Sequence, residues 1–178
     1  MHLLLRFSKL VDRFNDGFGW IADWMVLLSC LISAGNASVR YLLDTSSNGW
    51  LEIQWYMFSA IFLFGASQTL RMNEHVRVDI FYGMAPARAR LWIDALGILL
   101  FMLPATVLLM YMSWPFFVAS WPNEGSPNAG GLIRWPVKLL MPVGFFLLTC
   151  QGISELIKRV AALAGYIDLD THYEKPLQ

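Results

Sequence analysis

Four long apolar stretches follow one another along this chain, separated by short polar connections. They occupy about residues 20–43, 53–70, 91–118 and 137–164. A helix needs about 20 predominantly apolar residues to cross a hydrocarbon core about 30 Å thick. The pattern therefore predicts an all-α integral membrane protein with four transmembrane helices. These helices would form a single membrane domain over residues 1–167, followed by a polar cytoplasmic tail at 168–178.

The segment before the first stretch has a different, amphipathic pattern. Its apolar side chains fall on one helical face, and its charged side chains lie elsewhere; the apolar set is Leu3, Leu4, Phe7, Leu10, Val11 and Phe14. A basic amphipathic helix of this kind is typical of segments that lie along a membrane surface. We expect such an interfacial helix, with the chain turning into the membrane at Gly17–Gly19. A solvated helix against a soluble partner is the alternative, since amphipathicity alone does not name the apolar surface.

Turn-forming residues and prolines predict where loops, helix starts and kinks lie in the rest of the chain. Residues 44–49 are rich in turn formers and predict a short exit loop after the first span. Pro86 fits the first turn of a helix, because its fixed φ suits that position. Pro104 predicts a kink in the third span, since proline removes a backbone hydrogen bond. Residues 120–134, with several prolines and glycines, predict the one substantial outer loop.

The distribution of basic residues predicts the orientation. One side of the membrane would carry ten basic residues and the other three; the three are Arg40, Arg134 and Lys138. Cytoplasmic loops carry the excess of lysine and arginine, so both termini and the central connection are expected inside. Net charge is zero, which gives no general basic field for nucleic acid.

Chemistry-bearing residues are sparse. The three histidines (His2, His75 and His172) lie outside the spans or at their margin, whereas a haem-binding bundle needs axial histidines within its spans. Cys30 and Cys150 are single and within spans, where each reads as a small buried apolar residue. No metal-ligand spacing appears. The sequence thus indicates no cofactor and no enzymatic centre.

An ion-coupled pump acting alone is also disfavoured. Such a pump usually has an ionisable residue near the bilayer midplane, whereas the charges here lie within a turn or two of the span ends. No internal repeat marks a self-sufficient transporter. A scaffolding subunit remains, whose candidate interface or membrane-anchoring residues are Arg40, Glu52, Gln54, Arg71, His75, Asp79, Arg90, Arg134 and Lys138.

Several motifs resemble one known family. They are Trp50-Leu-Glu-Ile-Gln-Trp55, Leu63-Phe-Gly-Ala66, the string from Leu70 to Asp79 with Arg71, His75 and Asp79 at every fourth position, and then Pro86 and Arg90. Together they resemble the small membrane subunit (DctQ type) of tripartite ATP-independent periplasmic (TRAP) transporters. The stretch from Gly130 to Lys138 is similar to the subgroup labelled mannitol/chloroaromatic or 2-oxo-acid transport.

The resemblance implies a multi-pass protein of the bacterial inner membrane. It implies a large membrane subunit (DctM type) as partner, and a periplasmic substrate-binding protein that delivers a carboxylate-type solute under a sodium or proton gradient. Many family members carry two adjacent acids where this chain has Glu52 alone. The alternatives are a membrane anchor for an oxidoreductase, or an independent small-solute carrier.

Three local hypotheses follow for the charged residues. Arg71 and Asp79 would fix the bend between the second and third spans. Glu52 and Arg40 would pair near the outer surface. The loop at residues 120–134 would contact the binding protein.

Overall fold

The structure, a computed structural model, describes residues 1–45, 47–73, 82, 85–122, 125 and 130–169. Within them the chain is helical, with helices α1 (His2–Leu43), α2 (Asn48–Met72), α4 (Ala87–Gly97), η1 (Ile98–Met102), α5 (Leu103–Val118) and α6 (Trp135–Leu163). α4, η1 and α5 follow one another without a break. Each of the four predicted apolar stretches lies almost wholly in these helices, so its helical character is confirmed.

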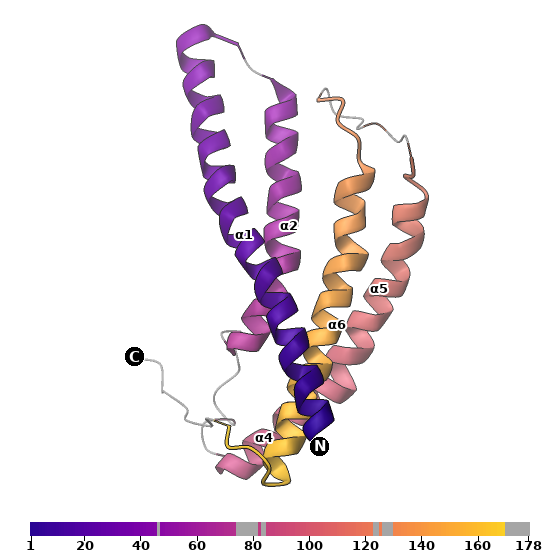
Figure 1. The fold of residues 1–178 in the computed structure, drawn as a ribbon. Helices are drawn as coiled ribbons and strands as arrows, with labels where there is room; N and C mark the ends of the chain where they lie inside the picture. Colours follow the sequence, from indigo (N-terminus) through magenta and orange to yellow (C-terminus); the bar gives the residue numbers. More distant parts are fainter. Residues whose placement is uncertain (46, 74–81, 83–84, 123–124, 126–129, 170–178) are drawn as a thin grey trace.

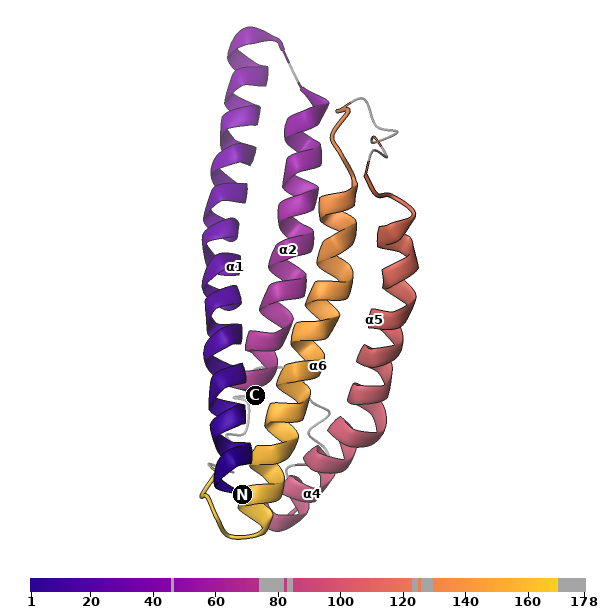
Figure 2. The same ribbon diagram turned by 45° about the vertical axis from the view of Figure 1, so that its right-hand side comes forward.

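The long helices lie side by side, with α6 in the middle of the assembly. α6 packs against α1, α2, α4, η1 and α5, whereas α1 packs against α2 and α6 (Figures 1 and 2). In Figure 2 the order across the view is α1, α2, α6 and α5. The central helix therefore joins the two halves of the molecule.

Three of these helical rods are long and apolar enough to cross a membrane. They are α1, the continuous rod of residues 87–118, and α6. α2 is 25 residues long, but polar side chains such as Gln54 and Gln68 dilute its apolar character. The all-helical membrane class is thus supported, while the count of four spans stays a prediction.

The expected break between an interfacial helix and the first span is wrong. α1 runs straight through Gly17 and Gly19 as one helix of 42 residues, so its first turns continue the direction of the span (Figure 1). Gly19 serves close packing instead of a turn, because a Cβ atom there would collide with the side chain of Gln68. Tertiary contact with α2 overrides the turn propensity of the glycines.

The first turns of α1 are amphipathic, as predicted, but their polar face points inward. Ser8 is 1% exposed and Asn15 is fully buried, whereas Leu3 is 81% and Leu10 is 68% exposed. Polar side chains of α6 receive this polar face. The apolar face is the one left on the outer surface of the bundle.

Proline effects appear near the positions that the sequence indicated. α4 begins at Ala87 with Pro86 as its N-cap residue. The five-residue π-helical segment η1 precedes Pro104, and the N–H of Leu103 bonds the carbonyl of Ile98 five residues earlier. A wide turn of this kind accommodates a proline ring that would clash with the carbonyl four residues back. Figure 2 shows the rod bending here, between α4 and α5.

Apolar packing inside the bundle is limited and depends on close helix approach. Ala22, Ala60, Phe64 and Leu147 form the buried apolar cluster, with contributions from α1, α2 and α6. α2 and α6 meet at Gly144, where an added Cβ would lie 2.6 Å from the Cβ of Leu63. Small residues at such crossings allow the backbones to approach, as is common in membrane bundles.

Gly144→Ala should therefore lower stability, because the new methyl group would collide with a side-chain atom that cannot swing away. Overpacking of this kind costs about 1–3 kcal/mol. Gly65→Ala is the matched control, since nothing lies within 4 Å of a Cβ atom there. Thermal unfolding of the two variants in detergent tests this; equal midpoints would contradict the close crossing.

Candidate functional site

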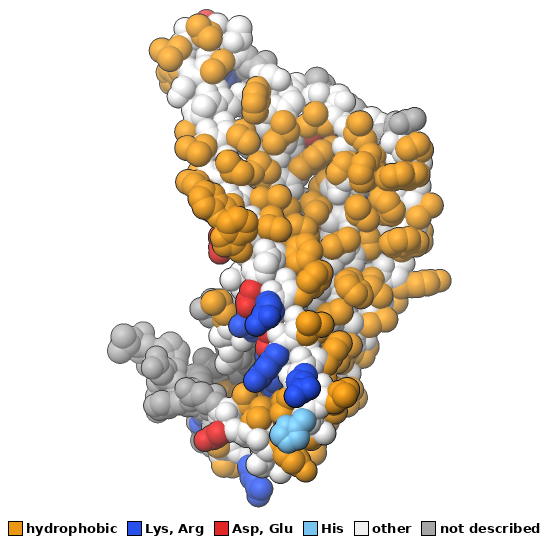
Figure 3. Space-filling view, viewed as in Figure 1, with side chains coloured by type: hydrophobic (Ala, Val, Ile, Leu, Met, Phe, Trp, Pro, Cys, Tyr) orange, Lys and Arg blue, Asp and Glu red, His pale blue; other side chains and the backbone are white. Residues whose placement is uncertain are grey.

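A continuous set of buried and partly buried polar side chains joins α1 to α6 near the N-terminal end of α1. It comprises Ser8, Asp12 and Asn15 of α1 and Gln151, Ser154, Glu155, Lys158 and Arg159 of α6. We call this set the polar seam. It lies where Figure 3 shows charged side chains gathering in the lower part of the visible face.

Gln151 is the centre of the polar seam and is itself fully buried. Its Oε1 accepts a hydrogen bond from Asn15 Nδ2 at 2.7 Å. Its Nε2 donates to Asp12 Oδ1 at 3.0 Å and to Glu155 Oε1 at 3.1 Å. One amide thereby connects α1 and α6, and its two acidic acceptors fix which way the amide is turned.

Ion pairs extend the polar seam toward the end of α6. Lys158 Nζ lies 2.7 Å from both Asp12 Oδ2 and Glu155 Oε1. Arg159 lies 2.5 Å from Glu155 Oε2 and 3.5 Å from Asp94 Oδ2 of α4. Burial disfavours every one of these charges, and their mutual pairing offsets that cost. The seam therefore holds three helices in register.

The sequence contains a signal for this seam that the hydrophobic pattern alone hides. Ser8, Asp12 and Asn15 are spaced i, i+4 and i+7, which puts them on one helical face. Gln151, Glu155 and Lys158 repeat the same spacing in α6. Two matching polar stripes on separate helices indicate a buried polar contact.

Arg71 is the predicted residue with the clearest structural role. It forms an ion pair with Asp16 and donates from Nη1 to the backbone oxygen of Asp12 at 3.4 Å. The end of α2 is thus tied to α1. Asp79 was the expected partner of Arg71 in the bend. Asp79 and His75 lie outside the described residues.

Arg90 is held close to the start of α4. Its Nε donates to the backbone oxygen of Ala85 at 2.9 Å, and its guanidinium lies 5.8 Å from the ring centroid of Tyr82. Tyr82 in turn donates to Asp94 Oδ2 at 3.0 Å. Arg90 thus orders the entry to the rod of residues 87–118.

Glu52 lies at the opposite end of the bundle and is only 3% exposed. Its carboxylate accepts from the Tyr56 hydroxyl and from the N–H of Leu132, each at 3.5 Å. A Cβ atom added at Gly130 would collide with this carboxylate. Arg40 is exposed and forms no ion pair with Glu52 in the described part of the chain. The expected Arg40–Glu52 pair is therefore replaced by an anchor for the loop before α6.

Three more predicted residues lie at this same end. Lys138 is 7% exposed, and its Nζ lies 4.3 Å from the ring centroid of Phe116 in α5. Gln54 is 7% exposed, and its Nε2 has no hydrogen-bond partner among the residues that the structure describes. Arg134 is half-buried at the start of α6. The candidate site thus consists of two sets of contacts that hold helices together. The polar seam lies at one end of the bundle, and the contacts of Glu52 lie at the other.

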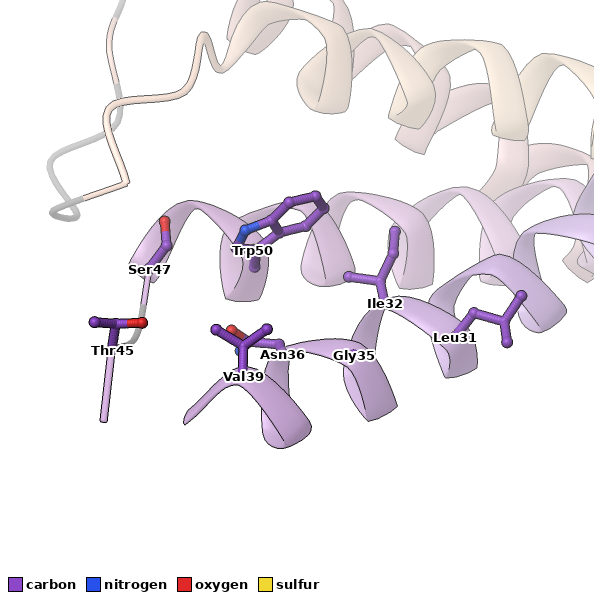
Figure 4. A pocket seen from close by; sticks show the side chains of 8 residues that line it. All are labelled: Leu31, Ile32, Gly35, Asn36, Val39, Thr45, Ser47 and Trp50. Atoms are coloured by element: carbon purple, nitrogen blue, oxygen red, sulfur yellow. The ribbon is translucent and has the colours of Figure 1, made fainter. Parts of the chain in front are cut away.

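A pocket of about 580 Å³ lies between the C-terminal part of α1 and the N-terminal part of α2 (Figure 4). Ile32, Asn36 and Val39 project from α1 toward α2, where Trp50 faces them. The lining carries no charged side chain. Among the described residues, no group of three or more His, Cys, Asp and Glu is placed to hold a metal ion.

Comparisons with known proteins show what this chain is similar to. The family model described as "Tripartite ATP-independent periplasmic transporters, DctQ component" matches residues 29–162. The chain is also 30% identical to the "C4-dicarboxylate TRAP transporter small permease protein DctQ" of Vibrio cholerae serotype O1. That alignment covers 86% of this chain and 75% of the relative.

The polar seam leads to a direct test at Asn15. Asn15→Leu should destabilise the protein by about 1–3 kcal/mol, because the buried Gln151 oxygen loses its donor. Ser59→Ala is the control, since that hydroxyl bonds only its own helix at Trp55. Unfolding by titration with a denaturing detergent gives the comparison. If Asn15→Leu unfolds no earlier than the control, the seam does not hold α1 to α6.

Proposed function

We propose, because the chain belongs to the DctQ-component family of tripartite ATP-independent periplasmic transporters, that it is the fixed membrane scaffold of such a transporter. The observation that carries this is the family match over residues 29–162. The chain is a small permease subunit and a multi-pass protein of the bacterial inner membrane. The family consists of transporter components, so neither the oxidoreductase anchor nor the independent carrier is favoured.

The proposed partners are a large membrane subunit of the DctM type and a periplasmic substrate-binding protein. The named function of the Vibrio cholerae relative is transport of C4-dicarboxylates. We infer that the complete transporter containing this chain takes up a carboxylate-type solute, driven by an ion gradient. The subgroup suggested by residues 130–138 stays a prediction.

We infer four spans with both termini in the cytoplasm. Trp135 suits the outer interface, where indoles settle. Twenty helical residues beyond it, about 30 Å, end at Glu155 in the polar seam. Arg71 of α2 reaches the same level, because it contacts Asp12 and Asp16 of α1. The cytoplasmic boundary then follows the seam, and α2 is the fourth span.

The outer surface of the bundle suits a scaffold in contact with another membrane protein or lipid. Large apolar side chains are exposed along every rod, including Phe62 of α2 at 74% and Phe101 of η1 at 76%. In the bilayer such surfaces are solvated by lipid or covered by neighbouring helices. Several of the buried polar groups connect one helix to another. This division favours a brace for a transporting subunit over a conduit within this chain.

Reconstitution tests the proposed role. Liposomes containing this chain alone should show no uptake of labelled C4-dicarboxylate under a sodium or proton gradient. Adding the large membrane subunit and the binding protein should restore uptake, and omitting this chain should abolish it. Uptake by the isolated chain, or full uptake without it, would overturn the proposal.

Arg71→Ala tests whether the ion pair between Arg71 of α2 and Asp16 of α1 supports assembly with the large subunit. Without the Asp16 pair, the end of α2 is free to shift, and less of the large subunit should co-purify with the tagged chain. Arg88→Ala removes an exposed positive charge near the same end and is the matched control. Co-purification from membranes, quantified by the ratio of the two subunits, decides the matter; an unchanged ratio for Arg71→Ala would refute the role of this residue.

A further inference from the structure

A second pocket, of about 420 Å³, lies between the first turns of α1 and the end of α6. Its lining includes His2, Leu5, Arg6, Lys9, Asp12 and Lys158. It adjoins the polar seam, because Ser8, Asp12 and Lys158 of the seam also line it. Figure 3 shows a histidine and several basic side chains close together in this lower region, with apolar side chains beside them.

Positive charge dominates this pocket. His2, Arg6 and Lys9 are spaced i, i+4 and i+7, which places them along one stripe of α1. Arg6 and Lys9 are exposed and make no hydrogen bond or ion pair within the described part of the chain. Asp12 does not balance them, because its carboxylate already accepts from Lys158, Gln151 and Ser154. The pocket therefore offers two uncompensated cations to an anion.

An apolar stripe runs beside the basic one on the same turns of α1. Leu3, Phe7, Leu10 and Phe14 are 81%, 44%, 68% and 57% exposed. At about 100° per residue, these positions form the face adjacent to His2, Arg6 and Lys9. A ligand that fits both stripes has an anionic group joined to a hydrocarbon chain.

The depth of the pocket agrees with this chemistry. On the proposed placement, the hydrocarbon boundary lies near Asp12 and Lys158. Lys9 and Arg6 are then about 5 Å and 9 Å beyond it along α1. The polar headgroup layer on each side of a bilayer is about 5–7 Å thick. The long side chains of arginine and lysine reach back toward the phosphates from this depth.

We propose that this pocket binds the phosphate headgroup of an anionic phospholipid, whose acyl chains extend past Phe14 into the hydrocarbon core. Basic pockets at the cytoplasmic ends of membrane helices are suited to such headgroups. The depth argument rests on the proposed membrane placement. The binding test requires only the purified full-length chain, so its failure is distinguishable from failure of the transport role.

The first experiment identifies the ligand. The full-length chain in neutral detergent is titrated separately with phosphatidylglycerol, phosphatidylcholine and inorganic phosphate, and thermal unfolding is followed. Phosphatidylglycerol should raise the unfolding midpoint in a saturable way, while the other two leave it unchanged. An equal rise with inorganic phosphate would overturn the lipid assignment in favour of a free-anion site. An equal rise with phosphatidylcholine would overturn the requirement for net negative charge.

The second experiment locates the binding. Arg6→Gln should weaken phosphatidylglycerol binding about fivefold, and the Arg6→Gln, Lys9→Gln double variant about 30-fold. Arg88→Gln removes one exposed basic charge outside the pocket and should bind like the parent protein. Arg6 and Lys9 are exposed, so the unliganded midpoints of all variants should agree. Equal weakening by Arg88→Gln, or unchanged binding by the double variant, would overturn the pocket assignment.

Discussion

The loss of the hydrophobic driving force in lipid is the constraint on which this structure depends. Hydrocarbon tails solvate leucine and phenylalanine as well as a protein interior does, so membrane helices associate through close packing and polar contacts. The chain follows that rule. Among the described residues, buried polar and charged side chains outnumber buried apolar ones, and large apolar side chains lie on the outer surface. The polar seam and the glycine crossings supply the cohesion that a soluble domain obtains from its core.

Different contacts hold the helices together at the two ends of the bundle. At one end, the polar seam connects α1, α6 and α4 through ion pairs and amide hydrogen bonds. At the other, Glu52 of α2 holds the N–H of Leu132 just before α6. Between α1 and α2 at that end, the helices leave a pocket instead of a tight contact. The polar seam between α1 and α6 and the pocket between α1 and α2 therefore lie toward opposite ends of α1.

The sequence predicted the helices well because length and apolar pattern are local properties. The last residue of α1 and both ends of α6 lie within two residues of the expected stretches, and Pro86 and Pro104 disturb the helices where local backbone chemistry requires. The sequence did not predict the continuous path of α1, because the role of Gly19 is set by its close contact with Gln68 of α2. Its neighbours along the chain give no sign of that contact. The Glu52 anchor was missed for the same reason, since its acceptor role depends on a loop 80 residues away. The hydrophobic pattern of one sequence does not show which distant segments contact each other.

An unbroken α1 has a mechanical consequence. Forty-two residues of helix extend about 63 Å, farther than the thickness of a bilayer with its headgroups. With no break at Gly17 or Gly19, this rod is one continuous helix. A tilt of α1 at Leu43 would carry through to its first turns, where the hydrogen bonds to α6 would resist it.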